Sequence, residues 1–475
     1  MDRRKPIILL LSIFFTAFYL LNCESFLVLF RPDFDIKMSP EHRAYVYEKM
    51  IEAFRKRDKS CEDQGLYCRR PETQHIDCGR VLIGDKEYQE TLVGVNRIPL
   101  IPDPFLNMSC AAISYRIHRK YLHYEPLKLR GTAFARIVYK DYEFIEKQVQ
   151  VSYHPQNAFC FVVDQKAPAE FHEKMKRLGE CVENVQVLPA TESYSSDGHN
   201  VNLGHLRCME SLVQRPNWSY LLLLQNHDVI SKSVYELDRI FDLMGGANDV
   251  AMSMESKGRR KMNLKWDPRS LRLFKNESGY PEEILNSEMT ISSGYVQGSL
   301  SRAAVEWITS ELDLTIFLDQ WSQTKYGCDE QLLSSLQVNQ AFGMPGHFTD
   351  ECIKQKMPVP MVTRMTLWAF GNPDSCATRT VRNELCIFGI EDFRALAGMP
   401  NLMFNKMIPS FDYSIVECAA ELLYNRTFLG QVDTVLNEEY YDNLPAVQYH
   451  KYHQEPGFLL NCTTDYGLWV YSDFL

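Results

Sequence analysis

The sequence has no basic tract interleaved with aromatic residues, and its charge balance is acidic. It carries 51 lysine and arginine residues against 61 aspartate and glutamate residues, which gives a net charge of -10. A nucleic-acid-binding protein generally presents a basic surface, so the composition argues against that class. The sequence also lacks C-x-x-C pairs and an H-E-x-x-H motif, which argues against a structural or catalytic zinc site.

Internal repeats and low-complexity tracts are also absent. Hydrophobic residues make up 45% of the chain and aromatic residues 12%, so the chain can bury a large core and is not a disordered protein. Its 475 residues fit one large domain or two ordinary domains with appendages.

The N-terminus has the pattern of a membrane anchor. Three basic residues at 3–5 precede an apolar run over 7–21, and residues 26–30 extend it toward the length of a bilayer span. No small-residue cleavage site follows the run, although a cleaved signal peptide stays the alternative. Basic residues on the short N-terminal side favour a cytosolic tail over 1–6, an anchor over 7–30 and a lumenal body.

The cysteines and glycosylation sequons indicate an oxidising compartment. The chain has 14 cysteines, 13 of them beyond Cys23. Thirteen is odd, so at least one thiol is free or pairs between chains, and a disulfide-linked dimer is one interpretation. Five N-x-S/T sequons lie at Asn107, Asn217, Asn276, Asn425 and Asn461.

Hydrophobic periodicity divides the rest of the chain. Residues 31–120 are mixed and charged, which we interpret as a stem and its transition into a catalytic body over 121–430. Within the body, apolar runs over 131–139, 157–164, 184–189 and 220–224 predict strands, and the segments between them carry helical spacing. This alternation predicts an α/β fold with a mostly parallel sheet. The last segment, 431–475, is an extension whose role the sequence does not indicate.

Acidic residues follow two of the predicted strands. Asp164 ends the strand FCFVVD, and the tetrapeptide QNHD at 225–228 follows the strand YLLLL. Ligands of open α/β sheets bind at the carboxyl ends of strands. Asp164 could therefore bind a ribose or uracil, or it could cap the next helix. The tetrapeptide could equally be an Asx turn ahead of a helix that Ser233 and Glu236 begin as a capping box.

Two carboxylates stand side by side in the stretch YGCDEQLLSSLQ. The apolar spacing behind them predicts a helix, with Asp329 as its N-cap and Glu330 in its first turn. The helix dipole favours the ionised form of Glu330, and an ionised carboxylate at a pocket edge can take a proton from a sugar hydroxyl. A capped helix with an exposed acid is the alternative.

Basic residues gather in a later stretch. Cys376 and Cys386 flank a loop that holds Arg379 and Arg382, and Lys406 follows twenty residues later. Fixed basic side chains can hold a diphosphate without a metal. Trp368 and Phe370 precede the loop and could form a platform for a sugar face, or belong to the core.

The order of these stretches resembles the core-2/I-branching β-1,6-N-acetylglucosaminyltransferases, glycosyltransferase family 14. The resemblance runs from about Cys78 to Asn425 and rests on HPQNAFCFVVD, LRCMESL, WSYLLLLQNHD, YGCDEQLLSSLQ, CIFGIEDF, FNKM and SIVEC. It implies a GT-A-like fold, a Golgi type II membrane protein and an inverting transfer that needs no metal or other cofactor. The implied donor is UDP-GlcNAc, and the implied acceptor is the 6-hydroxyl of a glycan or glycoprotein.

The resemblance also implies roles for single residues. Glu330 stands at the position of the catalytic base, Arg382 and Lys406 at the positions that hold the diphosphate, Asp164 at a nucleoside contact and Trp368 at an acceptor contact. The implied disulfides are Cys78–Cys418, Cys110–Cys181, Cys160–Cys208 and Cys376–Cys386. The extra cysteines are Cys61, Cys68, Cys328, Cys352 and Cys462, of which Cys61 and Cys68 are the easiest pair to imagine.

The sequence departs from the family pattern in four places, one of which is a short segment between Trp368 and Cys376. Arg382 lies one residue further from its cysteine, so Arg379 could share or take its role. The stretch SSDGHNVNLGH over 195–205 replaces a shorter one that usually bears a tryptophan, and Gly246 stands where an acidic acceptor-binding residue is expected. These departures leave a xylosyl donor, or a lumenal glycan-binding protein without turnover, as alternatives.

Overall fold

The structure is a computed structural model that describes residues 48–49, 51–55, 65–117, 122–255, 263–357 and 359–462. The predicted cytosolic tail and anchor, residues 1–30, lie outside the described residues. Within the described ranges, every helix is too short or too polar to cross a bilayer.

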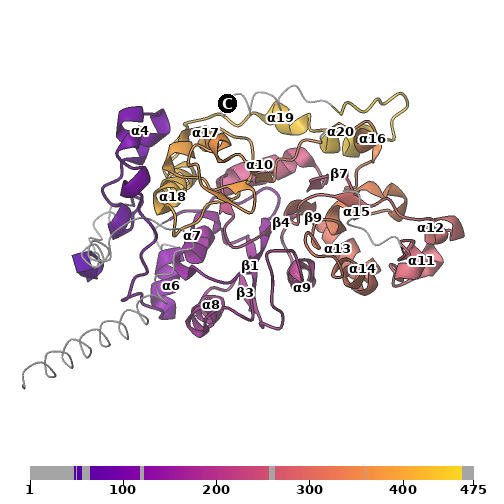
Figure 1. The fold of residues 1–475 in the computed structure, drawn as a ribbon, viewed down its shortest axis with the longest axis horizontal. Coiled ribbons are helices and arrows are strands. Elements are labelled where there is room, and N and C mark those ends of the chain that lie inside the picture. Colours follow the sequence, from indigo (N-terminus) through magenta and orange to yellow (C-terminus); the bar gives the residue numbers. More distant parts are fainter. Residues whose placement is uncertain are drawn as a thin grey trace, which may run out of the picture.

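A six-stranded sheet with the strand order β3-β2-β1-β4-β9-β6 forms the centre of the molecule (Figure 1). The four strands from β3 to β4 are parallel, and β9 runs antiparallel to both of its neighbours. The predicted α/β fold with a mostly parallel sheet is therefore confirmed. The strands are β1 (Thr132–Val138), β2 (Ala158–Val163), β3 (Val185–Leu188), β4 (Tyr220–Leu224), β6 (Asp249–Val250) and β9 (Gly298–Ser301).

Helices cover both faces of this sheet. Alternate residues of a strand point to opposite faces, so Phe134 and Val138 of β1 join one apolar core while Ala133 and Ile137 join another. Burial on both faces explains why these strands are continuous apolar runs. The first core is completed by α7 (Tyr142–Ser152), α8 (Ala169–Cys181), α10 (Val234–Met244), α17 (Phe393–Ala397) and α18 (Tyr413–Phe428), and the second by α9 (Val201–Leu212), α13 (Arg302–Glu311), α14 (Thr315–Trp321) and α15 (Leu332–Val338).

Local sequence signals explain where several helices begin and end. Ser233 and Glu236 form the predicted capping box of α10, and Gly245 ends that helix in the left-handed conformation. Helix α9 begins after Asn200, which adopts a positive φ that asparagine tolerates. Helix α8 continues two residues past Gly179 to Cys181, where the disulfide to Cys110 holds it.

A second, three-stranded sheet lies at the carboxyl end of β4. Its order is β10-β13-β5, with β5 (Val229–Ile230) leaving the QNHD turn and pairing antiparallel with β13 (Met403–Phe404), which pairs parallel with β10 (Arg364–Met365). Three segments that are far apart in sequence therefore meet beside β4. The remaining elements are β7 (Ser253–Met254) with β8 (Ser292–Ser293), β11 (Val381–Arg382) with β12 (Leu385–Cys386), α11 (Pro268–Leu271), η3 (Glu277–Gly279), α12 (Glu282–Asn286), η4 (Gln340–Phe342), α16 (Glu351–Lys354), η5 (Pro373–Ser375) and η6 (Ile390–Asp392).

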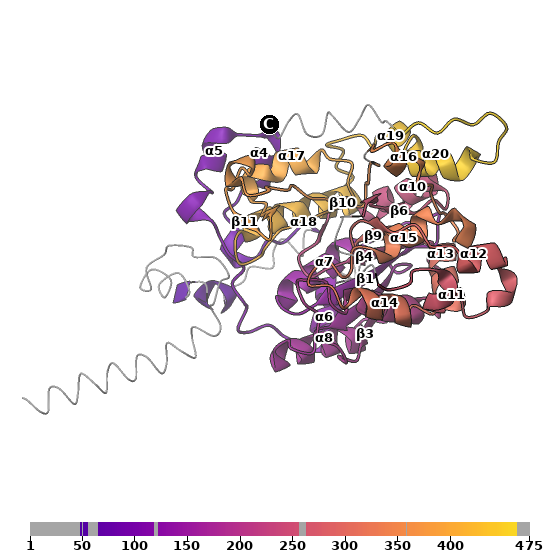
Figure 2. The same ribbon diagram turned by 45° about the vertical axis from the view of Figure 1, so that its right-hand side comes forward.

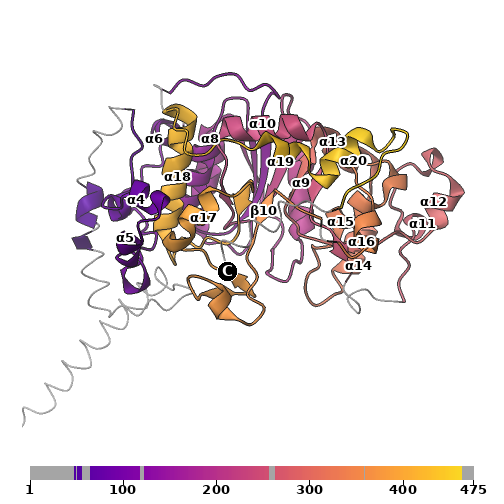
Figure 3. The ribbon, with the colours of Figure 1, turned by 90° about the horizontal axis from the view of Figure 1, so that it is seen from above.

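Part of the predicted stem belongs to the packed body. Residues from Tyr67 to Ile117 supply side chains to the first core, and Cys78 is bonded to Cys418 of α18. Figures 2 and 3 show this segment beside α17 and α18. Residues 67–117 of the predicted stem and transition therefore pack with the body. This segment contains η1 (Pro71–Thr73), α4 (Cys78–Ile83), α5 (Lys86–Glu90), η2 (Gly94–Asn96) and α6 (Cys110–Ile117).

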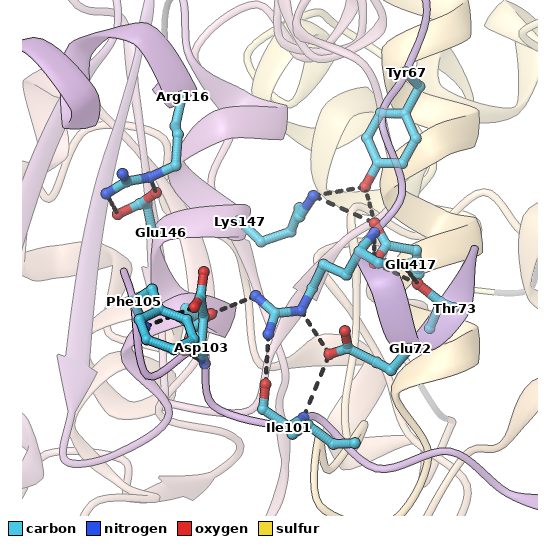
Figure 4. Close-up of polar contacts among 12 residues, drawn as sticks. Tyr67, Glu72, Thr73, Ile101, Asp103, Phe105, Arg116, Glu146, Lys147 and Glu417 are labelled. Atoms are coloured by element: carbon cyan, nitrogen blue, oxygen red, sulfur yellow. Dashed lines mark hydrogen bonds and ion pairs between the residues drawn. The ribbon is translucent and has the colours of Figure 1, made fainter. Parts of the chain in front are cut away.

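Buried ion pairs attach this segment to the body (Figure 4). The Arg70 guanidinium donates to Glu72 (2.7 Å), to Glu143 of α7 and to the Ile101 carbonyl (2.6 Å). Glu417 of α18 accepts from the Tyr67 hydroxyl and pairs with Lys147 (3.3 Å). This segment is attached largely by ion pairs and hydrogen bonds. Its sequence therefore lacks the apolar periodicity by which a core segment is usually recognised.

The C-terminal extension also packs on the body. Tyr441 and Val447 lie in the first core, from α19 (Glu438–Asp442) and α20 (Pro445–Tyr452). A disulfide joins Cys462 to Cys352 of α16, and the sequence did not predict this pair. Residues 431–462 are therefore an integral part of the domain.

The structure contains all four disulfides that the resemblance implied. Cys68 is disulfide-bonded, and Cys61 lies outside the described residues. Cys328 is a free, buried thiol. Four of the five sequon asparagines are exposed, and the exception is Asn425, which is half-buried in α18 and donates to Gln431 (3.0 Å).

The C-terminal disulfide should contribute strongly to stability because it closes a long loop. Replacing both Cys352 and Cys462 by serine should lower the free energy of unfolding by about 4 kcal/mol. Replacing both Cys376 and Cys386, ten residues apart, should cost about 2 kcal/mol less, since the entropy of closing a loop grows with its length. Denaturant unfolding checks both, and equal losses would contradict the argument.

Candidate active site

A fully buried carboxylate, Asp228, lies at the centre of the site. Its Oδ2 accepts from the Gln225 backbone (2.6 Å) and from Gln297 Nε2 (3.3 Å), and its Oδ1 accepts from Asn405 Nδ2 (2.5 Å). None of its surface is exposed to solvent. Asp228 therefore links the end of β4 with the loop before β9 and the segment after β13.

Arg364 of β10 closes this arrangement into a ring. One terminal nitrogen of its guanidinium donates to Gln297 Oε1 (3.1 Å) and the other to Asn405 Oδ1 (2.7 Å). Each amide thus accepts from the arginine and donates to the aspartate. We call Asp228, Gln297, Arg364 and Asn405 the four-residue ring. It pairs a half-buried cation with a buried anion through two oriented amides.

Arg136 of β1 forms hydrogen bonds with the backbone of the QNHD turn. Its guanidinium donates to the carbonyls of Asp228 (2.8 Å) and Gln225 (3.3 Å). Burial lowers the pKa of Arg136 to about 10, and the charge of Asp228 opposes that shift. The Asn226 side chain accepts from the Tyr139 backbone (2.8 Å) at the end of β1. The tetrapeptide is thus a turn fixed at the carboxyl edge of the sheet.

Lys406 follows the ring residue Asn405 and is half-buried. Burial, together with the nearby charges of Arg382 and Arg364, lowers its pKa to about 8, against the opposing effect of Asp228. Arg382 lies on β11, in the hairpin that the Cys376–Cys386 disulfide closes. Arg382, Lys406 and Arg364 therefore form one cationic group.

Arg379 lies apart from this group. Its side chain is largely exposed and pairs with Asp374 (3.4 Å), also exposed, within the same loop. Its φ of 51° places the backbone in the left-handed region, which turns this residue away from the β11 strand direction. Of the two arginines, only Arg382 has an electrostatic effect on Lys406.

The prediction that Asp329 caps the following helix is wrong. Helix α15 has Gln331 at its N-cap, without a side-chain hydrogen bond, so Glu330 also lies before the first turn. Tertiary contacts explain the later start. The Gly294 backbone N–H donates to the Glu330 carbonyl (2.7 Å), and the Cys328 backbone N–H donates to the Asp197 carbonyl (3.2 Å). The charges of both Asp329 and Glu330 act on Arg364.

Burial, together with the adjacent charge of Glu330, raises the pKa of Asp329 to about 6. Arg364 opposes the shift. Asp329 is therefore partly protonated under mildly acidic conditions, whereas a solvated aspartate would be ionised.

The loop over 194–199 connects Asp164 with the turn that carries Glu330. Asp164 accepts from the backbone of Tyr194 (3.3 Å) at one end of the loop and from Lys166 (2.8 Å). At the other end, Gly198 has a φ of 98°, and a Cβ there would collide with the Asp329 carboxylate. The departing stretch in the sequence is thus in direct contact with the candidate base turn.

His199 holds this loop in place through hydrogen bonds at both ring nitrogens. Its Nδ1 lies 2.7 Å from the Asp197 carboxylate and its Nε2 lies 2.9 Å from the Ser322 carbonyl. Two acceptors favour the doubly protonated ring, and the Asp197 hydrogen bond raises the pKa of His199. The buried Cys328 thiol packs 3.6 Å from both ring nitrogens.

Three aromatic rings extend outward from the four-residue ring. Arg364 lies 4.2 Å from the centre of the Tyr295 ring, and Trp368 donates to the Tyr295 hydroxyl (3.0 Å). Phe370 stacks on Trp368 with ring centres 5.6 Å apart and is 78% exposed. An exposed apolar face thus continues directly from the charged group.

The family model of the Core-2/I-branching enzymes matches residues 132–397, which is more than half of the chain and includes β1, the QNHD turn, Glu330 and Arg382. The chain belongs to this family. It is therefore a glycosyltransferase by family, and the resemblance seen in the sequence is confirmed.

Curated relatives support the same family. The beta-1,3-galactosyl-O-glycosyl-glycoprotein beta-1,6-N-acetylglucosaminyltransferase of bovine herpesvirus 4 (strain LVR140) is 24% identical over 382 residues, covering 76% of this chain and 84% of its own. The beta-1,3-galactosyl-O-glycosyl-glycoprotein beta-1,6-N-acetylglucosaminyltransferase 3 of Rattus norvegicus is 24% identical over 404 residues, covering 78% of this chain and 90% of its own. Among solved structures, the mannosyltransferase Ktr4p from S. cerevisiae in complex with GDP has 12% identity, covers 62% of this chain and 82% of its own, and has a TM-score of 0.23, too low to assign a fold.

Sequence reasoning missed three members of the four-residue ring and Tyr295. Gln297, Arg364 and Asn405 are single polar residues in three separate segments, and no local pattern marks them. Asn405 alone had a signal, because it stands beside Lys406 within the family stretch FNKM. The ring becomes visible only when the two sheets are brought together.

Asp329 should make stability depend on pH. Its folded pKa of about 6 lies above the unfolded value, so its contribution is fully present below about pH 4 and is lost as the pH rises through 6. Asp329→Asn should therefore stabilise the protein at pH 7 by on the order of 1 kcal/mol and have little effect at pH 4. Thermal unfolding across this range checks it. The exposed Asp319→Asn of α14 is the control, and a pH-independent gain would contradict the assignment.

Proposed function

We propose that this glycosyltransferase moves GlcNAc from UDP-GlcNAc to the 6-hydroxyl of a glycan acceptor, with inversion, on a GT-A-like fold. The observation that carries the proposal is the arrangement of one carboxylate and three cations: Glu330 acts on Arg364, and Arg364 and Arg382 act on Lys406. A base and a diphosphate-binding group thus share one edge of the sheet. The names of the curated relatives support the donor and the linkage.

In the proposed reaction, Glu330 takes the proton of the acceptor hydroxyl as its oxygen attacks the anomeric carbon of the donor. The new bond joins that oxygen to the carbon, and the bond from the carbon to the β-phosphate oxygen breaks. The electron pair leaves with UDP, whose developing negative charge Lys406 and Arg382 stabilise. Attack opposite the leaving group inverts the anomeric configuration.

Binding of the two substrates would use the surroundings of this group. Asp164 would accept hydrogen bonds from the nucleoside at the end of β2, and Trp368 with Phe370 would pack against a sugar face of the acceptor. Because the cationic side chains can neutralise the diphosphate themselves, no metal is required by this scheme. We also propose a Golgi membrane location with the catalytic domain in the lumen, which the disulfides and the four exposed sequons support.

A xylosyl donor is the second candidate. The observation in its favour is the loop over 194–199, which differs from the family pattern and contacts both Asp164 and the Glu330 turn. A donor panel distinguishes the two, since the acceptor-side chemistry is the same for both sugars.

Glu330→Gln should abolish transfer while leaving donor binding intact. Loss of the base should lower kcat by about 10²–10⁴-fold, because the amide cannot accept the hydroxyl proton. We would assay the body, residues 31–475, in EDTA with UDP-GlcNAc, UDP-xylose and a panel of glycan acceptors, and measure UDP binding by calorimetry. The exposed Glu283→Gln of α12 is the matched control.

Each outcome of this assay has a meaning. Transfer from UDP-GlcNAc in EDTA that Glu330→Gln abolishes supports the proposal, and turnover of UDP-xylose instead changes the donor. Full activity of Glu330→Gln would remove Glu330 from the mechanism. A lack of both turnover and UDP binding would favour a glycan-binding protein.

Lys406 should make UDP binding depend on pH. A pKa of about 8 means that the free protein loses this cation as the pH rises through 8. The bound diphosphate favours the protonated form, so affinity for UDP should fall by up to about tenfold per pH unit above 8. Calorimetry between pH 7 and pH 9 measures the slope. Lys406→Met should bind more weakly and without this slope, and a wild-type slope in that variant would assign the titration to another group.

A further inference from the structure

The four-residue ring has a chemical function beyond holding two sheets together. Both amides are oriented by charge, since the Asn405 and Gln297 NH₂ groups face Asp228 while their carbonyl oxygens face Arg364. The opposite orientation of either amide would direct its NH₂ group at the guanidinium and its oxygen at the carboxylate. The ring therefore has one stable arrangement.

Arg364 is the member of the ring that reaches the reacting groups. Its Nε is buried and has no hydrogen-bond partner among the described residues. The charged groups that act on Arg364 are Asp228, Asp329 and Glu330. On the other side Arg364 acts on Lys406, together with Arg382. Arg364 is thus the charge shared by the candidate base and the candidate diphosphate-binding group.

The ring also fixes backbone positions. Asn405 is bonded to Arg364 and Asp228 and is the residue directly before Lys406. Gln297 is bonded to the same two residues and follows Tyr295, whose ring packs on the Arg364 guanidinium and whose hydroxyl accepts from Trp368. A single guanidinium thereby determines where Lys406 and the aromatic face lie.

We propose that Arg364 is a positioning residue of the transfer reaction, which fixes the segment of Lys406 and the aromatic face through the ring. This inference rests on the proposed function, because it assigns Arg364 an effect on donor binding.

The role of the whole ring is tested by KM for UDP-GlcNAc. Arg364→Met removes the hydrogen bonds to both amides, so its KM should rise by more than about tenfold while kcat changes less. The matched control is Arg426→Met in α18, where a buried guanidinium donates to Asp433 (2.8 Å) and pairs with Glu236 (3.4 Å) outside the site. That variant should be less stable with an unchanged KM.

Two milder substitutions test the same geometry. Arg364→Lys cannot donate to both amides as the planar guanidinium does, so its KM for UDP-GlcNAc should rise about tenfold. Gln297→Met removes one side of the ring and keeps the cation. It should also raise KM, and it replaces Arg364→Met as the test if that variant fails to fold.

The outcomes distinguish this inference from the proposed function. An active Glu330→Gln variant would overturn the function itself. If Glu330→Gln is inactive while Arg364→Met keeps the wild-type KM, only the inference about Arg364 fails. Wild-type KM values in both Arg364→Lys and Gln297→Met would overturn that inference as well.

Discussion

The charge of Asp228, placed where no solvent reaches it, is the constraint on which the candidate site depends. Burying an unpaired carboxylate costs several kcal/mol, so its neighbours must be polar and correctly oriented. Here a backbone N–H, two amides and the cation of Arg364 meet that requirement. Since these groups come from the end of β4, the loop before β9, β10 and the segment after β13, the two sheets cannot shift independently. Lys406 and Tyr295 are next to ring residues and are therefore fixed with them.

Much of the fold was predictable because its signals are local. The four parallel strands are continuous apolar runs, and α10 has its capping box and its terminal glycine in the sequence itself. The site residues have a different basis: Glu330, Arg382 and Lys406 are named through the family resemblance, and their roles stay predictions. The ring could not be found by either route, because Gln297, Arg364 and Asn405 acquire their meaning only by contact with Asp228.

Tertiary contacts override local signals in several parts of the chain. Asp329 has the residue type and position of an N-cap, yet hydrogen bonds from Gly294 and to Asp197 hold the turn open and delay α15. Residues 67–117 and 431–462 have the mixed composition of peripheral segments. Ion pairs of Arg70 and Glu417, and disulfides to Cys418 and Cys352, attach them to the body instead of a long apolar face.

The loop over 194–199 connects Asp164 with the turn that carries Glu330. The backbone of Tyr194 donates to Asp164, and Gly198 lies so close to Asp329 that no side chain fits between them. A change of loop length or sequence must therefore move the surroundings of Asp164 and the Glu330 turn together. His199, held between Asp197 and Ser322, limits that movement. Under the proposed roles of Asp164 and Glu330, a change of donor sugar and a change in the position of the base would have the same structural cause in this loop.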